Sequence, residues 1–148
     1  MTGTNHVVTG ALIGAIVSSP IIAVPLAIAS HFLLDMLPHY GDRLVAKHSR
    51  GFHIFIIVDT VITISFLLVV LLLQPHHWQW MIVGGLMAMS PDLMWLPNYL
   101  RDVQNKAIKS YNKVMHWHEN IQVEREWGII VEAAWLLVVV PGCFWVFA

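Results

Sequence analysis

Residues 54–73 constrain this chain most, because they form a run of twenty mostly apolar residues with one acid and no Lys or Arg. A helix of this length rises about 30 Å, which is the thickness of the hydrocarbon layer of a bilayer. Of all 148 residues, 57% are hydrophobic and 11% are charged, whereas a soluble domain of this size needs more polar surface. We therefore expect a single integral membrane domain over residues 1–148.

The first 40 residues hold two shorter apolar segments. Residues 7–17 and 21–37 are separated by Ser18-Ser19-Pro20, which predicts a turn and hence a short N-terminal helical hairpin. The first segment is short for a crossing, so a tilted or re-entrant helix is expected there. Gly10 and Gly14 offer it a close-packing face against the second segment.

Two longer apolar segments, 78–96 and 127–147, can each cross a bilayer beside 54–73. In residues 99–123, apolar residues recur at three- and four-residue spacing with lysines off the stripe, which predicts an amphipathic helix on the membrane surface. We therefore predict an all-α fold, a polytopic membrane helix bundle of about five helices. Its parts are a short N-terminal helical hairpin, three longer spans and one cytoplasmic amphipathic helix.

The positive charges predict the orientation. All eight Lys and Arg residues lie in 43–50 and 101–125, and none lies in the turn 74–77. Because Lys and Arg concentrate in cytoplasmic loops, both basic stretches are expected in the cytoplasm and the turn outside. We therefore predict a multi-pass protein of the inner (plasma) membrane, with a cytoplasmic N-terminus and an external C-terminus.

Four acids, Asp35, Asp59, Asp92 and Glu132, lie inside or at the ends of the apolar segments, without a Lys or Arg beside them. A charge at the centre of a membrane helix costs about 2.5–3.5 kcal/mol on insertion scales, so it normally has a partner. Histidines are the available partners, and the predicted orientation places the acids and nearly all histidines in one cytoplasmic layer. Carboxylates and imidazoles without basic side chains are typical of a cation site.

The sharpest local pattern is Ser30-His31-Phe32-Leu33-Leu34-Asp35 followed by Pro38-His39. His31 and Asp35 are four residues apart and therefore lie on one face of a helix, where both can reach one ion. Pro38 favours a bend that turns His39 toward the same place. A hydrogen-bonded His–Asp pair inside a helix bundle would have the same spacing, so both interpretations stay open.

The other polar residues also have two interpretations. Asp59 is a ligand or an interhelical hydrogen-bond anchor, and Asp92 is a ligand or a helix cap. His116 and His118 face opposite sides of a helix, so one of them is expected to be an ordinary interfacial histidine. Glu132 lies too deep to reach water and is expected to be a ligand or a proton-transfer group.

Imidazole and carboxylate ligands without thiolates suit zinc, with manganese or iron as alternatives, and the site can hold one or two ions. The single cysteine, Cys143, excludes a disulfide framework and a cysteine-rich zinc cluster. The predicted metal ligands are His6, His31, Asp35, His39, His53, Asp59, Asp92 and His116, and the predicted catalytic residues are Glu132 and His118.

Several of these motifs together resemble a known family. His6 before a glycine-containing apolar helix, Ser-His-xxx-Asp-xx-Pro-His, Arg50-Gly51-Phe52-His53 and Ser-Pro-Asp resemble the bacterial inner-membrane metal-dependent hydrolases. That family is distantly similar to zinc-dependent phospholipase C, an all-helical fold. The resemblance spans most of the chain and implies that its metal ligands are His6, His31, Asp35, His53 and Asp92.

These features predict a membrane-bound, metal-dependent hydrolase that acts on a phosphoester, with phospholipid as a candidate, at the cytoplasmic membrane face. The bilayer and this substrate are the expected partners, and a net charge of −1 does not favour nucleic acid. A proton or divalent-cation transporter is one alternative, although the outer halves of the helices lack acids to continue a pathway. A non-catalytic membrane protein with a structural metal site is the other.

Overall fold

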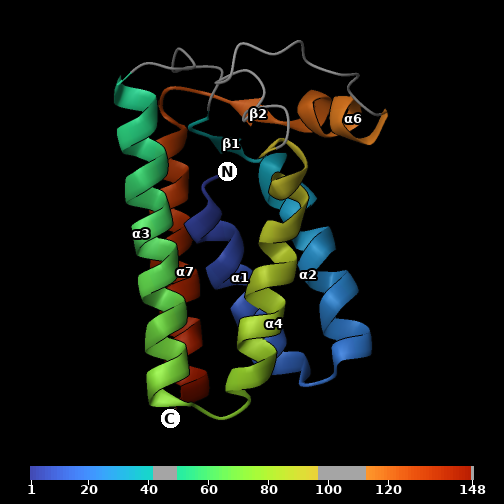
Figure 1. Cartoon of the computed structure of the whole chain (residues 1–148), viewed down its shortest axis with the longest axis vertical. Coiled ribbons are helices and arrows are strands. Elements are labelled where there is room, and N and C mark those ends of the chain that lie inside the picture. Colours follow the sequence, from blue (N-terminus) through green and yellow to red (C-terminus); the bar gives the residue numbers. More distant parts are fainter. Residues whose placement is uncertain (42–49, 97–112, 148) are drawn as a thin grey trace.

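The computed structural model describes residues 1–41, 50–96 and 113–147. These residues are almost entirely helical, so the prediction of an all-α fold is confirmed. Figure 1 shows α6, both strands and the N-terminus at one end of the bundle and the C-terminus at the other. The elements are α1 (Gly3–Val17), α2 (Pro20–Asp35), β1 (Pro38–His39), α3 (Arg50–Leu73), α4 (Trp78–Met89), η1 (Ser90–Met94), α6 (Lys113–Ile121), β2 (Val123–Glu124) and α7 (Gly128–Phe147).

The first helix, α1, is the centre of the bundle, where it packs against α2, α3, α4 and α7. The predicted hairpin of α1 and α2 is present, and Ser18 ends α1 in the left-handed conformation. Gly10 and Gly14, however, approach α4 rather than α2, because a Cβ at either residue would collide with the carbonyl oxygen of Gly84 or Trp80. Glycines on both helices let the two backbones meet this closely.

One helix among the described residues, α3, is long and apolar enough to cross a membrane by length and composition. It has 24 residues, and its most apolar window, with a mean hydropathy of 2.8, is only 11% buried. The apolar helices α1 and α2 are shorter, and α7 presents exposed apolar side chains such as Leu137 and Trp145. The expectation of several spans therefore stays a prediction.

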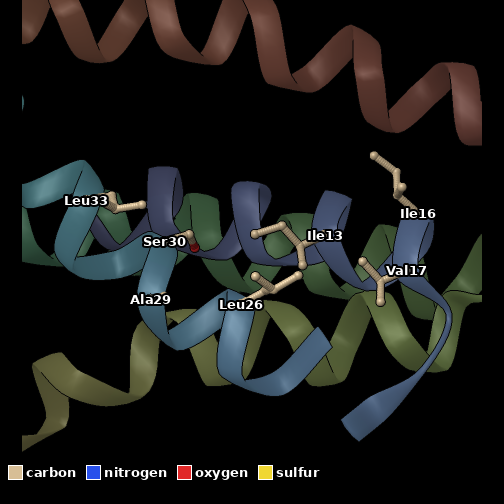
Figure 2. Close-up of a pocket in the computed structure, with 7 residues that line it drawn as sticks. All are labelled: Ile13, Ile16, Val17, Leu26, Ala29, Ser30 and Leu33. Carbon is tan, nitrogen blue, oxygen red and sulfur yellow. The ribbon is translucent and has the colours of Figure 1, made fainter. Parts of the chain in front are cut away.

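An open apolar groove lies between α1 and α2 (Figure 2). Its only polar lining residue is Ser30, whose hydroxyl donates to the backbone oxygen of Ala27 at 2.7 Å. The hydroxyl hydrogen of Ser30 is therefore used within α2, and the rest of the lining is apolar. The groove is lined by Ile13, Ile16, Val17, Leu26, Ala29, Ser30 and Leu33.

The predicted span 78–96 is a regular helix only as far as Met89 and then continues as the 3-10 turn η1. Pro91 explains the change, because its ring cannot supply an N–H and conflicts with the preceding helical turn. Of the predicted amphipathic helix 99–123, residues 99–112 lie outside the described residues. The described part is helical as α6 only to Ile121, and Val123 belongs to β2 instead, because it pairs with Pro38.

A two-residue parallel pairing joins β1 to β2, and the sequence did not predict it. Pro38 pairs with Val123 and His39 with Glu124, while the backbone N–H of Arg125 donates to the His39 oxygen at 2.8 Å. Gly128, the first residue of α7, lies so close to β1 that a Cβ there would collide with the His39 backbone. This pairing fixes the link between α6 and α7 to the end of α2.

Candidate metal centre

The centre of the site is Asp35 in the last turn of α2, which is fully buried. Its Oδ2 lies 2.7 Å from His118 Nε2 and 3.4 Å from His31 Nε2. Its Oδ1 lies 3.2 Å from His6 Nε2. Three imidazoles from α1, α2 and α6 therefore meet at one carboxylate.

A second carboxylate, Asp92 of η1, completes the cluster. Its Oδ1 lies 3.6 Å from His31 Nε2, and its side chain is 24% exposed, whereas those of His31 and Asp35 are fully buried. Ligand atoms of His31, Asp35, Asp92 and His118 all lie within 4.8 Å of one another. One ion can therefore reach two imidazole nitrogens and two carboxylate oxygens, a donor set that suits a divalent metal.

The orientation of His31 is fixed by the backbone of α4. His31 Nδ1 lies 2.7 Å from the Ala88 oxygen, and a carbonyl oxygen only accepts, so Nδ1 carries the hydrogen. In the neutral ring the lone pair then belongs to Nε2, which faces Asp35 and His118. A hydrogen bond of this kind is what usually fixes the tautomer and direction of a metal-binding histidine.

His6 provides the strongest sign of a missing partner. Its ring is fully buried and stacks on His31, with centroids 4.0 Å apart and an angle of 26° between the planes. Neither ring nitrogen has a hydrogen-bond partner among the described residues, although Nε2 lies 3.2 Å from Asp35 Oδ1. Burying an unsatisfied polar group is costly, and a bound cation would supply His6 with a partner.

One positive group already lies at the cluster. The amino group of Met1 contacts Asp35 Oδ1, so a metal ion at this carboxylate would share it with that group or displace it. A bound metal ion would stabilise the charged form of both carboxylates, Asp35 and Asp92. Imidazole and carboxylate donors without thiolates are typical of sites for divalent metal ions.

Five of the residues predicted from the sequence come together in this cluster: His6, His31, Asp35, Asp92 and His118. Three predicted histidines lie apart from it. His53 of α3 and His116 of α6 are exposed. His39 is buried in β1, where its Nδ1 donates to the Leu37 oxygen at 2.8 Å, and burial lowers its pKa below the usual 6.5.

Asp59 binds backbone groups at the start of α1. Its Oδ2 accepts the N–H of Gly3 at 2.8 Å, and its Oδ1 accepts the N–H and the hydroxyl of Thr4 at 3.1 and 2.6 Å. This geometry corresponds to the hydrogen-bond anchor that was one of the two interpretations of Asp59.

Glu132 has an equivalent set of partners and is also buried. Its Oε2 accepts the N–H of Thr2 and the side-chain amide of Asn5, both at 3.0 Å. Its Oε1 accepts the N–H of Tyr40 at 2.9 Å. Glu132 therefore binds the N-terminal segment (residues 1–5) through Oε2 and Tyr40, the residue that follows β1, through Oε1.

Besides the amino group of Met1, sequence reasoning missed two groups at the site. Gln122 Nε2 lies 3.4 Å from Asp35 Oδ2, and its position four residues after His118 was an available signal. The Ala88 oxygen, which orients His31, had no signal because every residue carries a carbonyl.

The cluster joins donors from four elements, α1, α2, η1 and α6, at one end of the bundle (Figure 1). It can bind a divalent cation at a partly exposed edge formed by Asp92. Its chemistry has to be inferred from these residues. No family model, curated protein or solved structure matches this chain.

Proposed function

We propose that this chain is a membrane-bound, metal-dependent hydrolase that cleaves a phosphoester at the end of the bundle that holds the cluster. The observation that carries the proposal is the meeting of His31, Asp35, Asp92 and His118 within 4.8 Å. The buried ring of His6, whose Nε2 lies 3.2 Å from Asp35 Oδ1, supports the same conclusion. Buried groups of this kind are costly without a bound partner.

The roles follow from burial and orientation. His31, His118 and Asp35 would hold the ion, because their donor atoms already converge in a buried position. When bound, a zinc-type cation supplies Lewis acidity and lowers the pKa of water toward about 7. Asp92 is the most exposed of the four, so a substrate would approach along its side of the cluster.

Gln122 offers a donor at the same place. Its side-chain amide reaches Asp35 Oδ2 at 3.4 Å and lies 3.5 Å from His118 Nε2. The first distance is long for a hydrogen bond, so this amide can turn to a better acceptor at little cost. We assign to this amide the role of orienting the substrate, by donating a hydrogen bond to a phosphoryl oxygen.

Membrane location is part of the proposal and is supported by apolar exposure. The most apolar window of α3 is only 11% buried, and the groove of Figure 2 is almost entirely apolar. Exposed apolar surface of this extent needs lipid or a partner to cover it. The positive-inside rule would put the cluster at the cytoplasmic face, beside phospholipid head groups, whose phosphoesters are the proposed substrate class.

A non-catalytic metal protein is the second candidate, because His6, His31 and Asp35 are fully buried. Structural metal sites are closed, whereas catalytic sites keep a position open. The half-buried side chain of Asp92 favours the catalytic alternative.

The test combines metal content with turnover. Purified protein in detergent should hold at least one metal ion per chain and cleave a chromogenic phosphodiester, and Asp35→Ala should lose both properties. His116→Ala is the control, because His116 is exposed on the same helix as His118. Bound metal without cleavage of soluble or lipid phosphodiesters would favour the structural role, and absence of metal after reconstitution would reject the proposal.

A further inference from the structure

The first residues of the chain lie between two acids that come from separate apolar helices, Asp59 of α3 and Glu132 of α7. Glu132 accepts the N–H of Thr2, and Asp59 accepts the N–H groups of Gly3 and Thr4. Three consecutive backbone donors are thus bound by two carboxylates that are 73 positions apart in the sequence.

These donors need outside partners because of their place in α1. The first N–H groups of a helix have no acceptor within the helix, and the usual remedy is a side chain at the N-cap. Here the N-cap residue, Thr2, makes no such bond. The two carboxylates replace it, and their charge is favourable at the positive end of the helix dipole.

The same contacts determine where His6 lies. Its N–H bonds to the Thr2 oxygen at 3.3 Å, and its neighbour Asn5 bonds to Glu132 at 3.0 Å. Among the described residues, Nδ1 of the His6 ring has no polar partner and Nε2 faces only Asp35 Oδ1, so the backbone and the stacking on His31 help to hold the ring in place. A shift of the α1 start would therefore move the His6 ring directly.

Glu132 also links this start to the other side of the cluster. Its Oε1 accepts the N–H of Tyr40, five residues after Asp35, while its Oε2 binds Thr2 and Asn5. One side chain of α7 therefore sets the position of the α1 start relative to the end of α2, which carries Asp35. Asp59 adds a second attachment from α3, with Thr63 in contact with Thr4 at 3.1 Å.

We propose that Asp59 and Glu132 are positioning residues that bind the N-terminal segment and thereby hold His6 at the metal centre. This inference rests on the proposed metal site. The two acids would raise metal affinity without contacting the metal, because they fix the position of His6. Groups that orient metal ligands typically change metal affinity about 10–100-fold when they are replaced.

The experiment measures Co²⁺ binding to the full chain in detergent, by the visible absorption spectrum and by affinity. We expect Asp59→Asn and Glu132→Gln to lower Co²⁺ affinity about tenfold, and the alanine variants to lower it about 100-fold. Their spectra should change in the way that His6→Ala changes the spectrum, because both kinds of substitution remove the His6 ring from its place beside Asp35. In a His6→Ala background the same substitutions should add little further loss, since residues acting through one group are not additive.

Matched controls separate positioning from general destabilisation. Val70→Ala on α3 and Val139→Ala on α7 remove buried side chains from the apolar cluster that includes Val8, Ala11 and Ala15, and keep the carboxylates that bind Thr2, Gly3 and Thr4. They should lower the melting temperature and leave the Co²⁺ spectrum unchanged. Hydrogen exchange should rise in a peptide covering residues 2–6 for the Asp59 and Glu132 variants and not for the controls.

The outcomes distinguish this inference from the proposed function. Wild-type Co²⁺ binding that is unchanged in every Asp59 and Glu132 variant would overturn the positioning role alone. Equal losses with and without His6 would also overturn it, because the acids would then act through another group. Failure of the wild-type protein to bind Co²⁺ or Zn²⁺ would instead reject the metal site itself, and the positioning role with it.

Discussion

The Nε2 atoms of His31 and His118 lie 3.1 Å apart, although 87 positions separate the two residues in the sequence. His31 Nδ1 binds the Ala88 oxygen, so the lone pair of the neutral His31 ring points at His118. A metal ion bound by both Nε2 atoms would take up the lone pair of each neutral ring.

The first prediction compares the two histidines of α6. Replacing His118 by alanine removes a donor 2.7 Å from Asp35, whereas His116→Ala removes an exposed ring from the same helix. We expect His118→Ala to weaken Zn²⁺ binding by more than about 100-fold, since even partners outside the ligand set change affinity about 10–100-fold. Competition with a chromogenic chelator measures both variants. Equal affinities would show that His118 is not a ligand.

The second prediction concerns metal removal. A ligand that binds only the folded protein stabilises it by about 2.7 kcal/mol at a free concentration of 100 times its Kd. We therefore expect a chelator to lower the melting temperature of the wild type, and added Zn²⁺ to restore it. In Asp35→Asn the melting temperature should respond to neither addition. A wild-type protein that melts at the same temperature with and without chelator would contradict a bound structural or catalytic ion.

The third prediction tests the close packing of α1 on α4. A Cβ at Gly10 would collide with the backbone oxygen of Gly84, which cannot move without shifting the helix. A Cβ at Gly142 of α7 would meet only the end of the Leu12 side chain, at 3.2 Å. Overpacking typically costs about 1–3 kcal/mol, so Gly10→Ala should clearly lower the free energy of unfolding.

Gly142→Ala is the matched control, and it should change the free energy of unfolding little, because the Leu12 side chain can turn away. Denaturation in mixed micelles compares the two variants. If both substitutions lowered the free energy of unfolding by similar amounts, α1 and α4 would be able to move apart easily at Gly10 and Gly84. That result would contradict the close packing of these two helices.

The fourth prediction uses the buried His39. Burial lowers its pKa in the folded protein below 6.5, so the unfolded chain takes up a proton that the folded chain does not. Its contribution to stability is therefore complete above pH 6.5 and is lost as the pH falls toward the folded-state pKa. The slope from one such group is at most about 1.4 kcal/mol per pH unit.

The difference in unfolding free energy between wild type and His39→Gln, measured in chelator from pH 7.5 to 5, should shrink toward acid pH. His53→Gln is the control, because His53 is exposed. A difference that stays constant with pH would mean that His39 titrates alike in the folded and unfolded chains.

Local patterns in the sequence predicted the helices and part of the site. The turn at Ser18-Ser19-Pro20 and the four-residue spacing of His31 and Asp35 are properties of neighbouring residues, and the structure contains both. The sequence could not show which of His116 and His118 belongs to the cluster, because the answer depends on which face of α6 meets α2.

The partners of Asp59 and Glu132 were beyond prediction for a different reason. Both acids bind mainly backbone N–H groups of the N-terminal segment, and such groups have no signature in the sequence. The β1–β2 pairing is equally hidden, since two residues are too few to show alternation.

The pairing of Pro38 with Val123 also has a consequence for the order of events during synthesis. The cluster draws its donors from His6, near the beginning of the chain, to His118, and α6 is attached to α2 through β2. A nascent chain that ends before β2 therefore contains His118 but lacks the strand that attaches α6 to the end of α2. We therefore expect the proposed metal to bind only after α6 has docked on α2.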